Sequence, residues 1–225
     1  LGADGTVGAN KSAIKIIGES TGLQVQGYFQ YDSKKAGAVT VSHLRFGNRP
    51  IRSTYLIGAG EAQFVACHQP GFLTRYDMLA KAAADGVFLL NSPLAPDAVW
   101  PSLPRPVQQQ LIDKRLKFYA VDAYGIATDT GMGRRINTIM QTCFFAVTAV
   151  IPLQEALGKT KAMVEKTYGR KGQHLLERNF AAIDAALAGL HEIAVPAQAD
   201  SRLEMPPVVA AAAPGGEKIE IKVEV

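Results

Sequence analysis

The sequence has few cysteines and histidines, and this shortage excludes several kinds of site. Its 225 residues include two cysteines, Cys67 and Cys143, and four histidines that lie far apart. Two cysteines cannot supply the four thiolates that an iron–sulfur cluster normally takes, and no CxxC motif is present, so no metal site is expected. Both cysteines lie in apolar stretches, which is typical of buried, reduced thiols in a cytoplasmic protein.

The usual signals of membrane and nucleic-acid binding are also missing. The longest apolar stretch, near residues 143–151, is shorter than the roughly 20 residues that span a bilayer. The first residues have neither a basic region nor an apolar core, so no signal peptide is expected. Lys and Arg number 24 against 20 Asp and Glu, but they form no basic patch interleaved with aromatic residues. We therefore expect neither a membrane nor a nucleic acid as a partner.

What is present is an alternation of strand-like and helix-like segments, with 48% hydrophobic residues to build one core. Apolar patterns predict strands at 23–31, 38–46, 64–67, 87–90 and 116–121. Helical patterns predict helices at 5–18, 72–84, 106–115, 124–130, 137–150, 153–168 and 172–193, with a short turn or helix at 96–100. This order is typical of β–α–β units. We expect an α/β fold with a Rossmann-like, mostly parallel sheet, helices on both faces and a helical C-terminal segment.

The composition changes after residue 195. Residues 196–216 are rich in proline, alanine and glycine, which predicts a linker. Residues 217–225, EKIEIKVEV, alternate strictly between apolar and charged side chains, which predicts one amphipathic strand. The expected organisation is a domain at 1–195, a linker at 196–216 and a terminal strand at 217–225, whose role stays open.

The first residues, GADGTVGANK, place three glycines around the start of the predicted helix at 5–18. Glycines let backbone N–H groups approach an anion, and a helix N-terminus adds free donors and partial positive charge. Close helix packing without a ligand explains the same glycines, so both interpretations stay open. The spacing is not the G-x-G-x-x-G of dinucleotide-binding folds. The acidic ribose partner is expected about 20 residues on, where only Asp32 is available, so a free-standing dehydrogenase is the weakest interpretation.

A phosphate-binding loop of this kind normally follows a strand. Here the glycines stand at the start of the sequence. Either the sequence is a piece of a longer chain or another segment fills the position of that strand. Residues 218–225 are one candidate, although their charged face suits the edge of a sheet better than a position buried on both sides.

Six stretches carry a resemblance to a known family: LGADGTVGANKSAIKIIGE, GYFQYDSKKAGAVTVSHLRFG, PIRSTYLI, FLLNSP, KFYAVDAY and GMGRRINTIMQTCFF. Together they resemble the third domain of pyruvate:ferredoxin/flavodoxin oxidoreductases, which corresponds to the γ subunit of multi-subunit 2-oxoacid oxidoreductases. The resemblance runs from residue 1 to about residue 196. Arg134 stands where glycine or asparagine is expected.

The resemblance implies one part of an enzyme that converts pyruvate and coenzyme A to acetyl-CoA and carbon dioxide, with electrons passed to ferredoxin or flavodoxin. Thiamine diphosphate and [4Fe-4S] clusters are then bound by other domains or subunits, which are the partners of this one within a homo-oligomer. This domain would bind coenzyme A and move its thiol towards the thiamine-bound intermediate. Alone it would be inactive.

The resemblance also implies which residues hold the phosphates of coenzyme A, since phosphate groups need backbone donors and cations. These residues are Gly2, Asp4, Gly5, Thr6, Gly8, Asn10, Lys11, Ser33, Lys34, Lys35, Arg135 and Asn137.

Structural roles stay open beside this assignment. Lys34 and Lys35 are equally explained as a solvated pair, and Lys11 can point to water. Asn137 can cap the helix that follows it. No catalytic residue is expected. A pocket lined by Lys35 and Arg135 would favour coenzyme A, whereas their burial in salt bridges would favour the alternative of an interface domain without a ligand.

Overall fold

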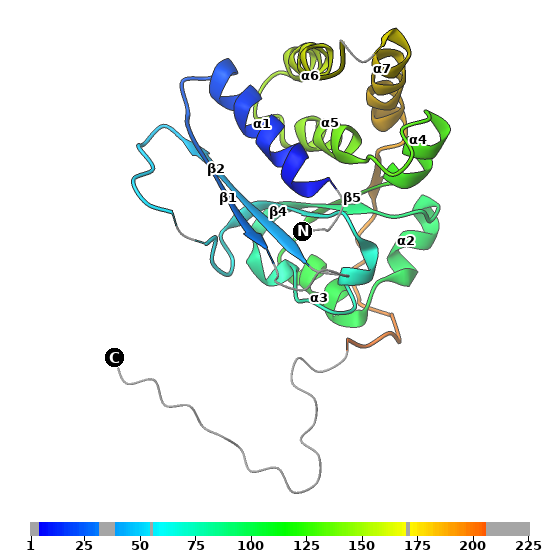
Figure 1. Ribbon diagram of the computed structural model, residues 1–225. Coiled ribbons are helices and arrows are strands. Elements are labelled where there is room, and N and C mark those ends of the chain that lie inside the picture. The colour runs from blue at the N-terminus through cyan, green and yellow to red at the C-terminus, as the bar shows by residue number, and fades with distance from the viewer. Residues whose placement is uncertain (1–4, 32–38, 55, 170–171, 206–225) are drawn as a thin grey trace, which may run out of the picture.

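In the computed structural model, the residues described are 5–31, 39–54, 56–169 and 172–205. Over these ranges the chain forms a four-stranded sheet, helices on both of its faces and a separate two-stranded hairpin (Figure 1). No helix in these ranges combines the length and the apolar character needed to cross a membrane.

The main sheet has the strand order β3-β4-β5-β6. Its strands are β3 (Ala62–Cys67), β4 (Ala82–Asn91), β5 (Lys117–Val121) and β6 (His191–Ile193). β3, β4 and β5 are parallel, and β6 runs antiparallel to β5. The run Phe88, Leu89 and Leu90 in β4 is at most 2% exposed, as expected for a central strand that is covered on both faces. The predicted mostly parallel sheet is confirmed.

Two groups of helices cover the two faces of this sheet (Figure 1). Side chains of α2 (Pro96–Ser102) and α3 (Arg105–Asp113) pack with Phe88 and Leu90 on one face. Leu89, which points the other way, packs with α4 (Ala123–Asp129), α5 (Asn137–Thr148) and α7 (Gln173–Ala188). A third cluster joins α1 (Thr6–Ser20), α5 and α6 (Leu153–Tyr168).

The first two predicted strands form a hairpin instead of joining the parallel sheet. β1 (Gln24–Tyr31) pairs antiparallel with β2 (Thr40–Gly47), with Gln24 opposite Gly47 and Tyr31 opposite Thr40. The parallel arrangement expected from β–α–β alternation fails here because a parallel connection needs a dozen or more residues, and fewer separate β1 from β2. α1 lies against this hairpin (Figure 1).

The predicted helix at 72–84 is wrong. Two short 3-10 turns, Pro70–Phe72 and Leu79–Lys81, stand in its place, and β4 begins at Ala82. The Lys114 ammonium group fixes this path by donating hydrogen bonds to three carbonyls, those of residues 79, 80 and 82, at 2.6–3.1 Å. Tertiary hydrogen bonds thus override the helix propensity of the alanines.

The predicted helix at 172–193 is too long at its C-terminal end. α7 ends at Ala188, and Gly189 follows as its C-cap, with its N–H bonded to the Ala185 carbonyl. Residues 191–193 then add the strand β6 to the sheet edge beside β5. A glycine at the end of a helix is a common stop signal, which the amphipathic pattern alone does not reveal.

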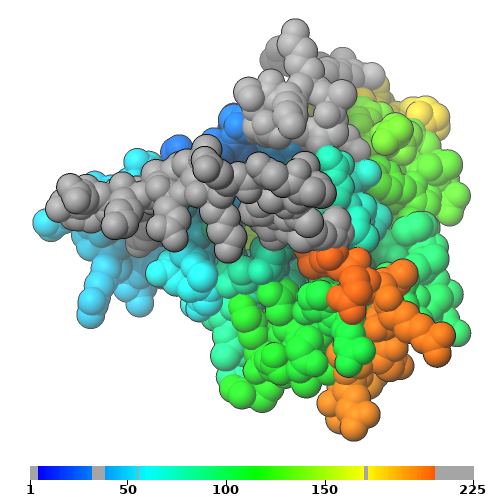
Figure 2. All heavy atoms as spheres, turned by 90° about the horizontal axis from the view of Figure 1, so that it is seen from below, coloured from blue at the N-terminus to red at the C-terminus, as the bar shows by residue number. Residues whose placement is uncertain are grey.

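A buried glutamine makes several of the hydrogen bonds that hold the described part of the predicted linker on the domain, beside those of the Trp100 indole N–H to Asp200 and of the Arg105 N–H to the Leu203 carbonyl. Gln108 of α3 is fully buried, and its amide nitrogen donates to the Trp100 carbonyl and the Asp200 carboxylate. Its amide oxygen accepts from the N–H groups of Asp200 and Ser201 at 3.0 and 2.9 Å. Figure 2 shows this segment, in orange, lying along the surface beside the green residues of α3. Residues 206–216 and the predicted strand 217–225 lie outside the described ranges.

A buried histidine makes the hairpin sensitive to pH. His43 of β2 is 2% exposed, and its Nδ1 accepts a hydrogen bond from the Ile57 N–H at 3.1 Å. Burial lowers the pKa of His43 below its ordinary value of 6.5, and the charges of Lys81 and Arg45 lower it further. Below about pH 6.5 the unfolded chain therefore binds more protons at this residue than the folded chain does. The folded state loses stability as the pH falls through this value.

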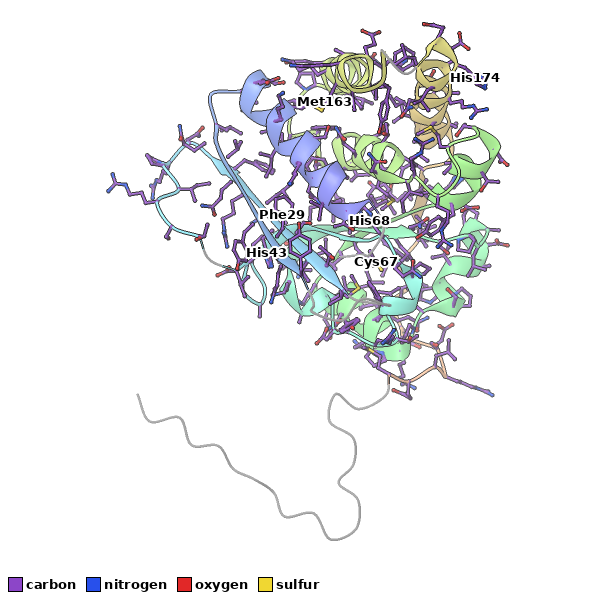
Figure 3. The ribbon with its side chains drawn as sticks, in the orientation of Figure 1. Phe29, His43, Cys67, His68, Met163 and His174 are labelled. Atoms are coloured by element: carbon purple, nitrogen blue, oxygen red, sulfur yellow. The ribbon has the colours of Figure 1, made fainter. Side chains whose placement is uncertain are left out.

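We expect the free energy of unfolding to fall between pH ~7 and pH ~5.5 through this residue, because the unfolded imidazole takes up a proton in this range more readily than the buried one. In His43→Asn, the amide oxygen can still accept a hydrogen bond from the Ile57 N–H, but the side chain does not titrate. Most of the loss of unfolding free energy at the lower pH should therefore vanish. Urea unfolding at both pH values measures it. His174→Asn is the control, because His174 is exposed on α7 and far from the hairpin (Figure 3). Equal pH dependence in His43→Asn and the unmodified chain would contradict the assignment.

Candidate anion site at two helix N-termini

The glycine loop and the GMGRRIN segment, far apart in sequence, meet in the structure. Gly5 is the N-cap of α1, with φ of 68°, in the left-handed region that favours glycine. A Cβ at Gly5 would lie 3.0–3.2 Å from the Cβ, N and Cα atoms of Asn137, the first residue of α5. The contact therefore brings the N-termini of α1 and α5 together, and only a glycine allows it.

Among the described residues, no side chain neutralises either helix end. The first intrahelical bonds run from Ala9 N–H to the Gly5 carbonyl and from Met140 N–H to the Ile136 carbonyl, both at 2.9 Å. The N–H groups of residues 6–8 and 137–139 are left without an intrahelical acceptor. No capping hydrogen bond and no acidic first-turn residue is found at either end. Two partial positive charges thus lie at one place.

Asn137 does not cap α5, which corrects the structural role considered for it. It is the first helical residue, and Ile136 occupies the N-cap position without a side-chain hydrogen bond. The helix begins one residue earlier than a capping role requires. Its position places its own N–H group among the free donors that face Gly5.

A buried hydroxyl lies at the same place. Thr6 is the first residue of α1 and is 3% exposed. Its Oγ1 has no hydrogen-bond partner among the described residues. Burying a hydroxyl without a partner costs about 1–3 kcal/mol, so such groups are usually satisfied by a water or a ligand. Thr6 is therefore an additional donor at the paired helix ends.

Arg135 supplies a cation close to the N-terminus of α5. It is exposed and forms no ion pair among the described residues; its Nε donates to the Met132 carbonyl at 3.1 Å. Met132 itself is 2% exposed and anchors this loop in the core. The Arg134 guanidinium lies 5.9 Å from the centre of the Tyr124 ring. The Arg135 guanidinium thus keeps its other N–H groups for a partner outside the domain.

Two of the residues predicted for the site point elsewhere. The Asn10 side chain donates to the Thr6 carbonyl at 2.6 Å, within α1. The Lys11 ammonium lies 5.5 Å from the centre of the Phe29 ring on β1, on the hairpin side of the helix. Gly8 does lie near the junction, because a Cβ there would be 3.9 Å from the Asn137 side-chain nitrogen. Gly2, Asp4, Ser33, Lys34 and Lys35 lie outside the described residues.

Three members of the site, Val7, Thr138 and Ile139, were not predicted from the sequence. They contribute backbone N–H groups, so their side chains carry no signal. The start of the predicted helix at residue 137 was the only indication available, since every helix leaves its first donors free.

At the junction of α1 and α5, the described residues offer backbone N–H groups, a hydroxyl and a guanidinium, which suit the binding of an anion. Burial raises the pKa of the Cys67 thiol to about 11 and that of Cys143 to about 12, so both stay protonated at neutral pH. No group of three or more His, Cys, Asp or Glu side chains in the described ranges could hold a metal ion. The arrangement of free N–H groups and Arg135 suits a phosphate group.

The sequence matches known proteins over nearly its whole length. Residues 1–189 match the family model "Pyruvate ferredoxin/flavodoxin oxidoreductase". A putative pyruvate-flavodoxin oxidoreductase of Synechocystis is 57% identical over 215 residues, and the pyruvate-flavodoxin oxidoreductase of Rhodospirillum rubrum is 54% identical over 214 residues. Each alignment covers 95% of this chain but 18% of the relative, so the chain spans less than a fifth of these proteins.

Solved structures share the fold. Subunit PORC of the pyruvate oxidoreductase from Thermotoga maritima superposes with a TM-score of 0.63 over 83% of this chain and 90% of that one, at 18% identity. At this identity the likeness shows the fold alone. The family match and the relatives above 50% identity establish that this chain belongs to the pyruvate ferredoxin/flavodoxin oxidoreductase family.

Proposed function

We propose that this domain binds coenzyme A for a pyruvate:ferredoxin or pyruvate:flavodoxin oxidoreductase. The supporting observation is the junction of the uncapped N-termini of α1 and α5 at Gly5 and Asn137. Coenzyme A carries a diphosphate and a ribose phosphate, which are the anions that such a junction attracts. The relatives named pyruvate-flavodoxin oxidoreductase supply the enzyme class.

In this proposal the domain positions coenzyme A and performs no bond-breaking step. The free N–H groups of residues 6–8 and 137–139 hold a phosphate, the Thr6 hydroxyl donates to it, and Arg135 neutralises its charge. A domain that moves as one body would then carry the coenzyme A thiol to the thiamine-bound intermediate. The protonated thiols of Cys67 and Cys143 take no part, since both are buried.

The rest of the chemistry belongs to other domains or subunits of the cytoplasmic parent enzyme, which are the partners of this domain in a homo-oligomer. There, thiamine diphosphate would cleave pyruvate, and [4Fe-4S] clusters would pass the electrons to ferredoxin or flavodoxin. The sequence has two cysteines, so this chain cannot supply the usual four cluster ligands. The domain alone should therefore turn over no pyruvate.

Calorimetric titration with coenzyme A tests the proposal. Arg135→Ala should raise the Kd about 10- to 100-fold, because a charge-assisted hydrogen bond contributes about 1.5–3 kcal/mol. Arg75→Ala is the matched control: Arg75 is also exposed, and its guanidinium lies against Tyr76 in the segment after β3, which belongs to neither α1 nor α5. It removes the same charge, so it should change the Kd less than about twofold.

Two results would overturn the assignment. Equal weakening in Arg135→Ala and Arg75→Ala would mean that coenzyme A responds to net charge and not to the junction. Binding by the unmodified chain that Arg135→Ala leaves unchanged would place the ligand elsewhere. The Lys35→Ala variant adds the test of a predicted cation that lies outside the described residues.

A further inference from the structure

A cavity of about 620 Å³ runs along the edge of β3. Five consecutive residues of that strand, 62–66, line it. Successive side chains of a strand point to opposite faces of the sheet, so a cavity over one face touches every second residue. A cavity that touches all five must lie beside the strand, along its hydrogen-bonding edge.

The opposite side of the cavity is formed by β2 of the hairpin. Val41, Ser42 and Leu44 line it, again from both faces of the strand. β3 is an edge strand of its sheet, and β2 belongs to a sheet of two strands in which it pairs with β1. Two strand edges thus face each other across the cavity, which is the geometry of a sheet with one strand missing.

The lining of the cavity combines apolar side chains from the helices with charged side chains at and just before β4. Ala9 and Ala13 of α1 and Phe144 of α5 contribute the apolar part. Lys81 and Asp85 contribute charges of both signs. A strand that fits here needs one apolar face and one face with charges of both signs.

We propose that residues 217–225 of this chain occupy the cavity as an added β-strand between β3 and β2. Their sequence, EKIEIKVEV, carries isoleucine and valine at alternate positions and both lysine and glutamate at the others. The apolar side chains pack beneath α1 and α5, and the charged ones face Lys81 and Asp85. Addition of a strand to an exposed edge gains main-chain hydrogen bonds on both sides.

The chain can reach this position. Met205, the last described residue, packs against the core cluster that contains Ala62 and Val65 of β3. Residues 206–216 can span up to about 36–40 Å when extended. A four-stranded sheet is only about 15 Å across, at roughly 4.8 Å per strand spacing. The segment is therefore long enough to bring residues 217–225 to the β3 edge from any side of the sheet.

Amide hydrogen exchange on the full chain tests the proposal without coenzyme A. The amides of β3 should exchange at least tenfold faster in the variant Ile221→Lys, which places a charge on the apolar face. Glu220→Lys is the control: it also introduces a lysine, but on the charged face, and should change β3 exchange less than twofold. The amides of the central strand β4 serve as the internal reference that each variant is folded.

Removal of residues 217–225 should have the same effect on β3 as Ile221→Lys. Protection of β3 that survives this removal would overturn the proposal and assign the edge to another occupant. Protection that falls on dilution together with a change from dimer to monomer would also overturn it, because a second copy would then supply the strand.

Discussion

Gly5→Ala should destabilise the domain by about 2–3 kcal/mol, whereas Gly8→Ala, one turn further along α1, should stabilise it. Gly5 has a positive φ, which costs a residue with a Cβ about 1–2 kcal/mol. The new Cβ would also lie 3.0–3.2 Å from three atoms of Asn137, two of them backbone atoms that cannot turn aside. At Gly8 the nearest atom is 3.9 Å away, so alanine fits and gains about 0.5–1 kcal/mol of helix propensity.

Urea unfolding of the two variants beside the unmodified chain measures both effects. The opposite signs make the pair informative, because each variant adds the same methyl group to the same helix. Destabilisation by both substitutions in equal measure would mean that the close contact between Gly5 and Asn137 does not exist as described.

Gln108→Leu should cost about 3–4 kcal/mol, although leucine has nearly the same volume. The substitution leaves the buried Ser201 N–H without a partner, at about 1–3 kcal/mol, and removes the hydrogen bonds of Gln108 to the Asp200 N–H and the Trp100 carbonyl, at about 1 kcal/mol each. Residues 195–205 should also detach from α3 and become open to proteases. Limited proteolysis and the unfolding midpoint measure the two consequences.

Gln109→Leu is the matched control for this prediction. Gln109 is the next residue of α3, is exposed, and bonds only to the Asp113 carboxylate on the same helix. It should change the free energy of unfolding by less than about 0.5 kcal/mol. Similar losses in the two variants would refute the role of Gln108 as the anchor of the C-terminal segment.

Most helices and strands could be predicted from local patterns, and each failure has a physical cause of its own. α6 was predicted with its observed bounds, 153–168, because its amphipathic pattern is long and starts after a proline. The segment 72–84 was misassigned because Lys114, far away in sequence, fixes its backbone. Likewise, the pairing of β1 with β2 follows from the length of their connection and not from the strands themselves.

The candidate site was predictable only in part. The glycines at 5 and 8 and the GMGRRIN segment were chosen from separate stretches, and the structure brings Gly5 and Asn137 into contact. No sequence pattern shows that two helix N-termini meet, because that depends on how α1 and α5 pack. The same packing turns Lys11 towards Phe29, which spacing along one helix could not reveal.

The paired helix ends are tested most directly by nitrogen–proton NMR of the full chain during titration with coenzyme A. If coenzyme A binds at the junction of α1 and α5, the amide signals of residues 6–8 and 137–139 should shift together and give one dissociation constant. Signals of the surface around Arg75 should stay unchanged. Shifts confined to one helix end, or to β2 and β3 around the cavity, would contradict binding at this junction.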